Sequence, residues 1–353
     1  MCQEKIPLKD YSPAEVSRLF LDMNEPAYRA DQLLDWIYQK KVLHAEEMSN
    51  LPVSLREKLK QEVQLNMLSI KEKIVSPKDK TIKLLLETLD NHLIESAVMR
   101  QDYGNTVCVS SQIGCGLACV FCASAKGGLV RNLSPGEMLD QVILAEKALA
   151  ESEREREERI KNIVVMGMGE PLNNLRSLVK FLETANNPQG LGISLRNVTV
   201  STAGIAPRIV KFAESKLPVT LAVSLHAPDN ETRSKLMPIN QKYPIQEVLD
   251  ACKTYMEKVG RRITFEYILL AGVNDSNAKA KKLAQRLKGL SGHVNLIPAN
   301  PVGDQNIEKP SKERIKEFYQ ILCGHNIHVS IRKERGEDID GACGQLRRRY
   351  QEN

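Results

Sequence analysis

Cys108-Val-Ser-Ser-Gln-Ile-Gly-Cys115-Gly-Leu-Ala-Cys119-Val-Phe-Cys122 is the stretch of sequence around which the chain is organised. Three of its cysteines have the spacing CxxxCxxC, and Cys108 lies upstream of them. Cysteine thiolates hold iron–sulfur clusters. A closed zinc site needs a fourth ligand, and no second Cys or His pair follows closely. The spacing therefore indicates a metal centre with one open position, and three buried or zinc-bound cysteines are the simpler alternative.

The composition is that of an ordinary globular protein with a slight excess of positive charge. A chain of 353 residues predicts two modules, one large and one small. No apolar run reaches membrane-spanning length and the N-terminus lacks a signal peptide, so we expect a cytoplasmic protein with no membrane association. Eight cysteines in a reducing compartment favour metal or redox chemistry over a disulfide framework. The net charge of +6 fits a polyanionic partner and equally fits a basic metabolic enzyme.

Residues 1–75 are predicted to form an N-terminal helical domain. Ser12-Pro13-Ala-Glu15 has the pattern of an N-cap, a first-turn proline and a capping-box glutamate. A second helix is expected over residues 28–38, and a third begins near Ser54. This domain is either a small RNA-docking module or a helical cap on the main domain.

Residues 76–105 are predicted to form a β-rich connection that carries Glu95. The runs 81–87 and 92–99 are separated by Asp90-Asn91, which is typical of a hairpin turn. A third run, 106–110, leads directly into the cysteine stretch, and Ser134-Pro135 opens a helix behind it.

Strands and helices then alternate through a core assigned to residues 106–345, followed by a basic tail at 346–353. Apolar runs predict strands over 162–166, 196–201, 218–224, 263–270, 293–297 and 327–331. Repeated βα units imply a parallel sheet with right-handed crossovers, so we expect an α/β fold built as a partial, open (β/α)6 version of the eight-fold barrel. Functional residues should lie where strands end, which is where Glu170, Ser201, Ser224, His226 and Asn300 occur.

Five further motifs make a family resemblance specific: GMGEP at 167–171, STAG at 201–204, SLHAP at 224–228, NLIPANP at 295–301 and DIDGACGQL at 338–346. With CxxxCxxC, they resemble the RlmN family of radical S-adenosylmethionine (SAM) methyltransferases. That family methylates C2 of an adenine in 23S rRNA, and some members also act on tRNA. The related Cfr family methylates C8 of the same adenine.

The resemblance implies a 4Fe-4S cluster held by Cys115, Cys119 and Cys122, and two SAM molecules per turnover. Adenine C2 is electron-poor, so a carbon radical can add there, whereas direct displacement of the methyl group of SAM cannot work. By resemblance, Cys343 is first methylated, and that methyl group is then activated by hydrogen abstraction. Glu95 takes the position of the proton acceptor. Cys108 is the resolving cysteine, which forms a transient disulfide with Cys343 as the product leaves.

By resemblance, SAM is held by residues at the strand ends, namely Gly169, Glu170, Ser201, Ser224, Leu225, His226 and Asn300. The implied partners are 23S rRNA in a protein-poor assembly intermediate, tRNA, and an electron donor such as flavodoxin or ferredoxin, and the chain is expected to be a monomer. Phosphate contacts are assigned to the tail residues 347–350 and to Lys126, Arg131, Arg332, Lys333 and Arg335, with a solvated tail as an equal alternative.

Three alternatives remain at this point. A Cfr-like enzyme would methylate C8, although Pro171 and the NLIPANP motif look more like the RlmN family. A non-catalytic zinc- and RNA-binding protein would leave Glu95, Cys108 and Cys343 without a purpose. A radical SAM enzyme acting on a protein or small molecule would tolerate loss of Cys343. Taken singly, Cys108 and Cys343 fit small buried residues, and Glu95 fits a charged residue on the surface of a strand.

Overall fold

One large sheet organises the computed structural model, which describes residues 5–152, 159–299, 308–332 and 336–339. Its ten strands lie in the order β14-β13-β12-β11-β10-β9-β6-β5-β4-β3. Strands β6 and β9 to β14 run parallel, whereas β3, β4 and β5 are antiparallel to their neighbours. The strands are β3 Leu68–Val75, β4 Ile82–Thr88, β5 Leu93–Met99, β6 Asn105–Cys108, β9 Ile160–Val165, β10 Val198–Thr202, β11 Thr220–Ser224, β12 Ile263–Leu269, β13 Gly292–Pro298 and β14 His328–Ile331.

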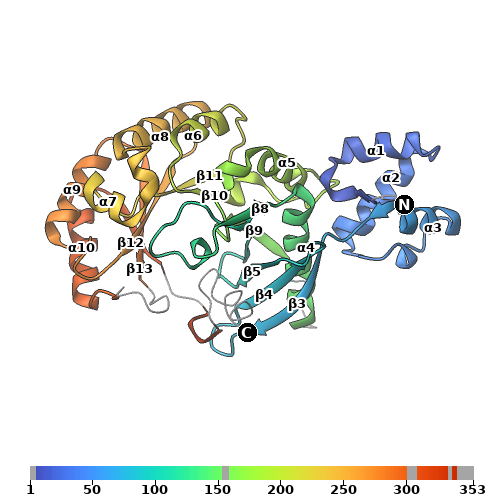
Figure 1. Cartoon of the computed structure of the whole chain (residues 1–353), viewed down its shortest axis with the longest axis horizontal. Coiled ribbons are helices and arrows are strands. Elements are labelled where there is room, and N and C mark those ends of the chain that lie inside the picture. Colours follow the sequence, from blue (N-terminus) through green and yellow to red (C-terminus); the bar gives the residue numbers. More distant parts are fainter. Residues whose placement is uncertain (1–4, 153–158, 300–307, 333–335, 340–353) are drawn as a thin grey trace.

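Helices follow the parallel strands and cover the outer face of the sheet (Figure 1). They are α4 Pro135–Ser152, α5 Leu175–Asn186, α6 Ala206–Ala213, α7 Asn230–Leu236, α8 Ile245–Val259, α9 Asn277–Leu287 and α10 Lys312–Gly324. The sequential strand order and the repeated βα units confirm the predicted partial barrel. Leucine, isoleucine, valine and phenylalanine side chains between sheet and helices form most of a single large core.

The N-terminal helices lie to one side of this sheet (Figure 1). They are α1 Pro13–Asp22, α2 Ala27–Leu34 and α3 Val53–Glu62, with short paired strands β1 Ile6–Pro7 and β2 Val63–Gln64. The predicted capping box is present, because Ser12 Oγ accepts from the amide of Glu15 while Glu15 Oε2 accepts from the amide of Ser12. The expected helix over 28–38 continues past α2 as one π-helical turn, Asp35–Gln39.

Strand β3 lies inside the segment 1–75 that was predicted to be helical. It pairs with β4 in the large sheet, so the helical part ends before residue 68. The predicted hairpin is confirmed, with β4 and β5 antiparallel and Asn91 in the left-handed conformation that a tight turn favours. Among the described residues, no helix is both long enough and apolar enough to cross a bilayer.

Candidate active site

A cavity of 820 Å³ lies on the inner face of the sheet, opposite the helices. Its wall comes from strands β4 to β6 and β9 to β14, so side chains that alternate inward on neighbouring strands face one space. Five of the predicted site residues line it: Glu95, Cys108, Ser201, Ser224 and His226. Asn300 and Cys343 lie outside the described residues.

The cysteine stretch leaves β6 and forms a loop closed at its base by the strands β7 Gln112–Gly114 and β8 Leu129–Asn132. The amide of Cys115 donates to the carbonyl of Gly128 at 2.9 Å. Gly114 has φ +76°, and a Cβ there would lie 1.9 Å from the carbonyl oxygen of Gly128. Only glycine allows the two sides of the loop to approach this closely.

The three predicted cluster ligands lie on this loop in a largely apolar environment. Cys115 is buried, whereas Cys119 and Cys122 are half-buried. Loop residues Leu117, Cys119 and Phe121 pack against a small core cluster, Ala203, Leu236, Met237, Leu270 and Ala299. No three Cys, His, Asp or Glu side chains in the described ranges converge as ligands of a single metal ion.

Burial raises the pKa of the Cys115 thiol to about 11 and that of Cys119 to about 12. The neighbouring loop thiols add to both shifts, so the three sulfur atoms lie near enough to repel one another as thiolates. A bound cationic centre reverses this cost by stabilising the thiolate form. Three soft thiol donors on one loop, half-shielded from water and beside a cavity, fit an iron–sulfur cluster with one open iron.

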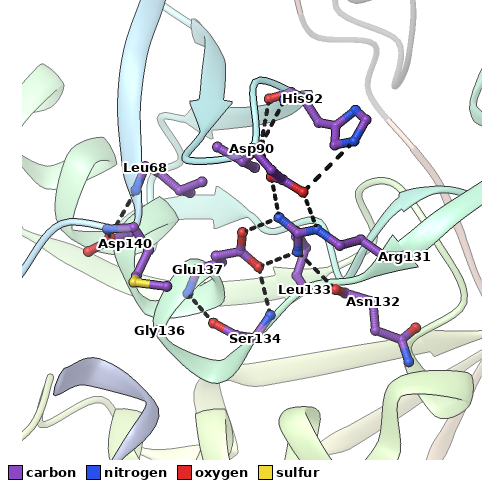
Figure 2. Close-up of polar contacts among 12 residues, drawn as sticks. Leu68, Asp90, His92, Arg131, Asn132, Leu133, Ser134, Gly136, Glu137 and Asp140 are labelled. Carbon is purple, nitrogen blue, oxygen red and sulfur yellow. Dashed lines mark hydrogen bonds and ion pairs between the residues drawn. The ribbon is translucent and has the colours of Figure 1, made fainter. Parts of the chain in front are cut away.

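Arg131 fastens the cysteine loop to the rest of the protein (Figure 2). Its guanidinium donates to both carboxylate oxygens of Asp90, in the β4–β5 turn, and to both of Glu137, in the first turn of α4, at 2.7–2.8 Å. The remaining donor bonds the carbonyl of Asn132 at 3.1 Å. All five guanidinium donors are therefore engaged, which contradicts the prediction that Arg131 faces phosphate.

Gly169 and Glu170 lie below the cavity surface at the end of β9. Gly169 has φ +103°, and a Cβ there would lie 2.5 Å from the Cβ of Gln112, so close packing on the cysteine stretch already requires glycine. Glu170 is 3% exposed, and its carboxylate accepts from the amides of Leu172 at 3.1 Å and Ala203 at 2.7 Å. Burial raises the pKa of Glu170 to about 7. This carboxyl group joins the ends of β9 and β10.

His226 connects the cysteine loop to the cavity. It has φ +56°, and its ring meets the ring of Phe121 edge-on with centroids 4.7 Å apart. Nδ1 accepts from the amide of Ile268 at 3.0 Å, and burial, aided by Arg233, lowers the pKa of His226 to about 3. The ring is therefore neutral at pH 7 with its proton on Nε2, where it is a donor.

Ser201 and Ser224 are half-buried at the carboxyl ends of β10 and β11. Leu225 is fully buried, and its amide donates to the carbonyl of Glu266 on β12. Both serine side chains line the cavity, whereas Leu225 holds the end of β11 against β12.

Glu95 and Cys108 come together on the inner face of the two neighbouring strands β5 and β6. Cys108 pairs with Ala97, two residues beyond Glu95, so the two side chains lie diagonally across the strand pair. Ser96 Oγ donates to the carbonyl of Cys108 at 2.8 Å and Ser110 Oγ donates to the carbonyl of Glu95 at 2.7 Å. Burial raises the pKa of the Cys108 thiol.

The structure adds polar residues that the sequence patterns did not single out. Glu266, Asn295, Ser330 and His293 form a hydrogen-bonded chain across β12, β13 and β14, with contacts of 2.8, 3.1 and 2.7 Å. The signal in the sequence is a polar residue at an inward position of β12 and β14 and two such residues in β13, a pattern that can be recognised only once the register is known.

Arg233 on α7 is fully buried beneath the strand ends. Burial lowers its pKa to about 10. It donates to acceptors from five residues, Leu225, Ala203, Ser224, Asn240 and Tyr243, at 2.7–3.5 Å. These contacts set the spacing between the ends of β10 and β11. Among the other phosphate candidates, Arg332 lines the cavity, whereas Lys333, Arg335 and residues 347–350 lie outside the described ranges.

Comparisons with known proteins agree with this geometry. Residues 109–284 match the profile of the Radical SAM superfamily, and residues 6–65 match that of the ribosomal RNA large subunit methyltransferase N-terminal domain. The chain is similar to a radical SAM methyltransferase from Sphaerobacter thermophilus of known structure, with a TM-score of 0.93, 41% identity, and coverage of 96% of this chain and 98% of that one.

Full-length relatives show the same similarity. A probable dual-specificity RNA methyltransferase RlmN from Desulforamulus reducens is 46% identical over 99% of both chains. One from Clostridium acetobutylicum is 46% identical over 97% of this chain and 96% of its own. The chain therefore belongs to the RlmN family of the radical SAM superfamily.

Proposed function

We propose that this protein methylates C2 of an adenine in 23S rRNA, and of an adenine in tRNA, through a methylated cysteine. The relatives named above are dual-specificity RNA methyltransferases of the RlmN family. The observation that carries the proposal is the placement of Glu95 and Cys108 on one face of one cavity, beside the cysteine loop. A carboxylate and a thiol that share a cavity provide a base and a resolving nucleophile for one substrate.

Cys115, Cys119 and Cys122 hold the 4Fe-4S cluster in this proposal. When bound, the cluster supplies one electron that cleaves SAM to a carbon radical and takes one electron back from the substrate. Ser201, Ser224 and His226 hold SAM beside it, with the Nε2 proton of His226 available as a donor, and Glu170 supports this site from below by joining β9 to β10. An external one-electron donor such as flavodoxin or ferredoxin would reduce the cluster before the first cycle, because the adduct returns the electron in each turnover.

Two thiols carry the methyl group and release it. The thiolate of Cys343 takes the methyl group from a first SAM, leaving a thioether and S-adenosylhomocysteine. The carbon radical from a second SAM takes one hydrogen atom from that methyl group and becomes 5'-deoxyadenosine, and the remaining methylene carbon bonds to adenine C2. The adduct then loses one electron and its C2 proton, and Glu95 accepts the proton.

Release breaks the bond between sulfur and the transferred carbon. The Cys108 thiolate attacks the sulfur of Cys343, a disulfide forms, and the carbon leaves with the bonding electron pair and takes a proton to become methyl. A thiol reductant then supplies two electrons to restore both cysteines.

Mass spectrometry of rRNA fragments tests the proposal. RNA from a host that lacks the endogenous enzyme is incubated with purified protein, SAM and reductant. A methyl group on C2 together with methylated Cys343 is the expected result. A methyl group on C8 would identify a Cfr-like enzyme, and protein that holds zinc without methylated Cys343 would overturn the enzyme assignment.

Cys108→Ala provides a sharper second measurement. Without the resolving thiol, the adduct between Cys343 and RNA should accumulate as a denaturant-stable band. Cys252→Ala is the matched control, since Cys252 is fully buried on the outer side of the sheet in α8 and should leave release unaffected. Free methylated RNA at the normal rate from Cys108→Ala would exclude the resolving role.

A further inference from the structure

Lys83 on β4 places a buried ammonium group in the wall of the cavity. Its Nζ lies 3.0 Å from Oε2 of Glu95, and the two side chains are 2% and 3% exposed. Both residues line the cavity. Lysine and glutamate are almost never buried to this degree unless they are paired.

The strand register puts this ion pair next to the proposed resolving thiol. Lys83 pairs with Ala97 across β4 and β5, and Ala97 pairs with Cys108 across β5 and β6. Directly paired residues share a face of the sheet, so Lys83, Glu95 and Cys108 all point inward. Burial raises the pKa of Cys108, and the charges of Arg332 and Lys83 act in the opposite direction.

A buried ion pair is a poor device for stability alone, because removing two charges from water costs as much as their attraction returns. Apolar residues of similar volume hold such positions equally well, and the neighbours Ile82, Leu84 and Leu85 on β4 are apolar and fully buried. A charged pair in a cavity wall therefore indicates a role toward the substrate.

We propose that Lys83 is a positioning residue whose ion pair with Glu95 fixes the orientation of that carboxylate toward the adenine. This deepens the proposed function and rests on it. In the step concerned, the C2–H bond of the adduct breaks and an O–H bond forms on Glu95. Lys83 takes part in this step only through its contact with Glu95, which holds the accepting oxygen in place.

A double-mutant cycle separates this role from simple packing. Lys83→Met, Glu95→Gln and the double variant are compared in single-turnover formation of methylated adenine. We expect Lys83→Met to slow the reaction about a hundredfold near pH 7, the low end for loss of general base catalysis. In the Glu95→Gln background the same substitution should change the rate less than about twofold, because the two residues act through one group.

Rescue by the conservative variant gives a second readout, which a loss of packing alone would not show. Lys83→Arg retains the charge and the hydrogen-bond donors and should restore part of the rate, whereas Lys83→Met should not. Lys73→Met is the matched control: Lys73 lies on the adjacent strand β3, pairs with the exposed Glu151, and its loss should leave the rate unchanged.

The outcomes distinguish the two proposals. Methylation of Cys343 precedes proton transfer, so its extent should be the same in Lys83→Met as in the unsubstituted protein. An equal slowing in both backgrounds, or a Lys83→Arg variant as slow as Lys83→Met, overturns the role of Lys83 while the function stands. If Lys83→Met fails to fold, the double variant, which carries neither charge, is compared with Glu95→Gln. A methylation rate of the double variant well below that of Glu95→Gln overturns the inference. No C2 product from the unsubstituted protein overturns the proposed function itself.

Discussion

The ring of Phe121 lies edge-on against the ring of His226, with centroids 4.7 Å apart. Phe121 precedes the last cysteine of the loop, and His226 lies two residues after the end of β11 in a left-handed conformation. Through this contact the residues that follow β11 help to position the loop that carries the proposed cluster ligands. The structure thus makes the loop and the strand ends one unit, which several substitutions can test.

His226 should make stability depend on pH. Its pKa falls from 6.5 to about 3 on folding, so the unfolded state binds the proton first as the pH drops. Stability is therefore fully present above pH 6.5 and declines below it, by up to about 1.4 kcal/mol per pH unit. Denaturant unfolding between pH 4 and 7 measures this slope. In His226→Asn, whose side chain can still accept from Ile268 and tolerates positive φ, the slope should be shallower by that amount; an unchanged slope would contradict the assignment.

The Arg131 contacts predict a stability loss that depends on the two carboxylates. Arg131→Met should cost about 2 kcal/mol at pH 7, between the values for exposed and buried ion pairs. The pKa of Asp90 is held below its usual value first by the hydrogen bond from Arg131, so this contribution is present above the usual Asp range and is lost as the pH falls below it. Arg314→Met, which removes an exposed pair with Glu317, should cost less than about 0.5 kcal/mol. Urea unfolding measures the loss of unfolding free energy in both variants. Equal losses would exclude the role of Arg131 in holding the cysteine loop to the rest of the protein.

Gly114 and Gly128 offer a matched pair at the base of the cysteine loop. Both have positive φ, but a Cβ at Gly128 meets open space whereas one at Gly114 meets a carbonyl at 1.9 Å. Gly128→Ala should cost only the left-handed strain of about 1–2 kcal/mol and keep its iron. Gly114→Ala must displace the loop and should lose most of its iron. Iron analysis after anaerobic reconstitution measures this, and equal iron in both variants would refute it.

The three loop cysteines should each be required for iron. Replacing any one of Cys115, Cys119 or Cys122 by alanine removes a ligand, so visible absorbance and SAM cleavage should fall to background. Cys252→Ala should retain iron and cost about 1–2 kcal/mol of stability, since it leaves a small hole in the core. Full iron content in any of the three loop variants would exclude that residue as a ligand.

Local patterns were sufficient to predict much of this fold. The Ser12 capping box, the turn at Asp90-Asn91 and the alternating βα segments depend on neighbours in the sequence, and all appear in the structure. The π-helical turn Asp35–Gln39 was not foreseen, because its pattern does not differ from that of a regular helix.

Tertiary placement accounts for the residues that the sequence did not reveal. From the sequence alone, Lys83 would be expected to be an exposed charge in an apolar strand. In the structure, the pairing of β4 with β5 places its side chain beside Glu95. Arg233 looks like a surface residue of a polar helix, yet all its recorded hydrogen bonds are to backbone carbonyls and one amide of the interior. Register and helix docking decide both cases, and neither has a short-range signature.

The turn between β3 and β4 also holds a distant part of the chain. Ser76 Oγ donates to both carboxylate oxygens of Asp338 at 2.9 and 3.1 Å, and the amide of Gly336 donates to Asp79 at 2.9 Å. Thr81, at the end of this turn, lines the cavity. Cys343 follows Ile339 by four residues, which span about 14 Å at most. In the proposed cycle this tether limits the reach of the Cys343 thiol, so the attack of Cys108 on its sulfur is an intramolecular step with an effective concentration on the order of millimolar or more, and it should outcompete free thiols.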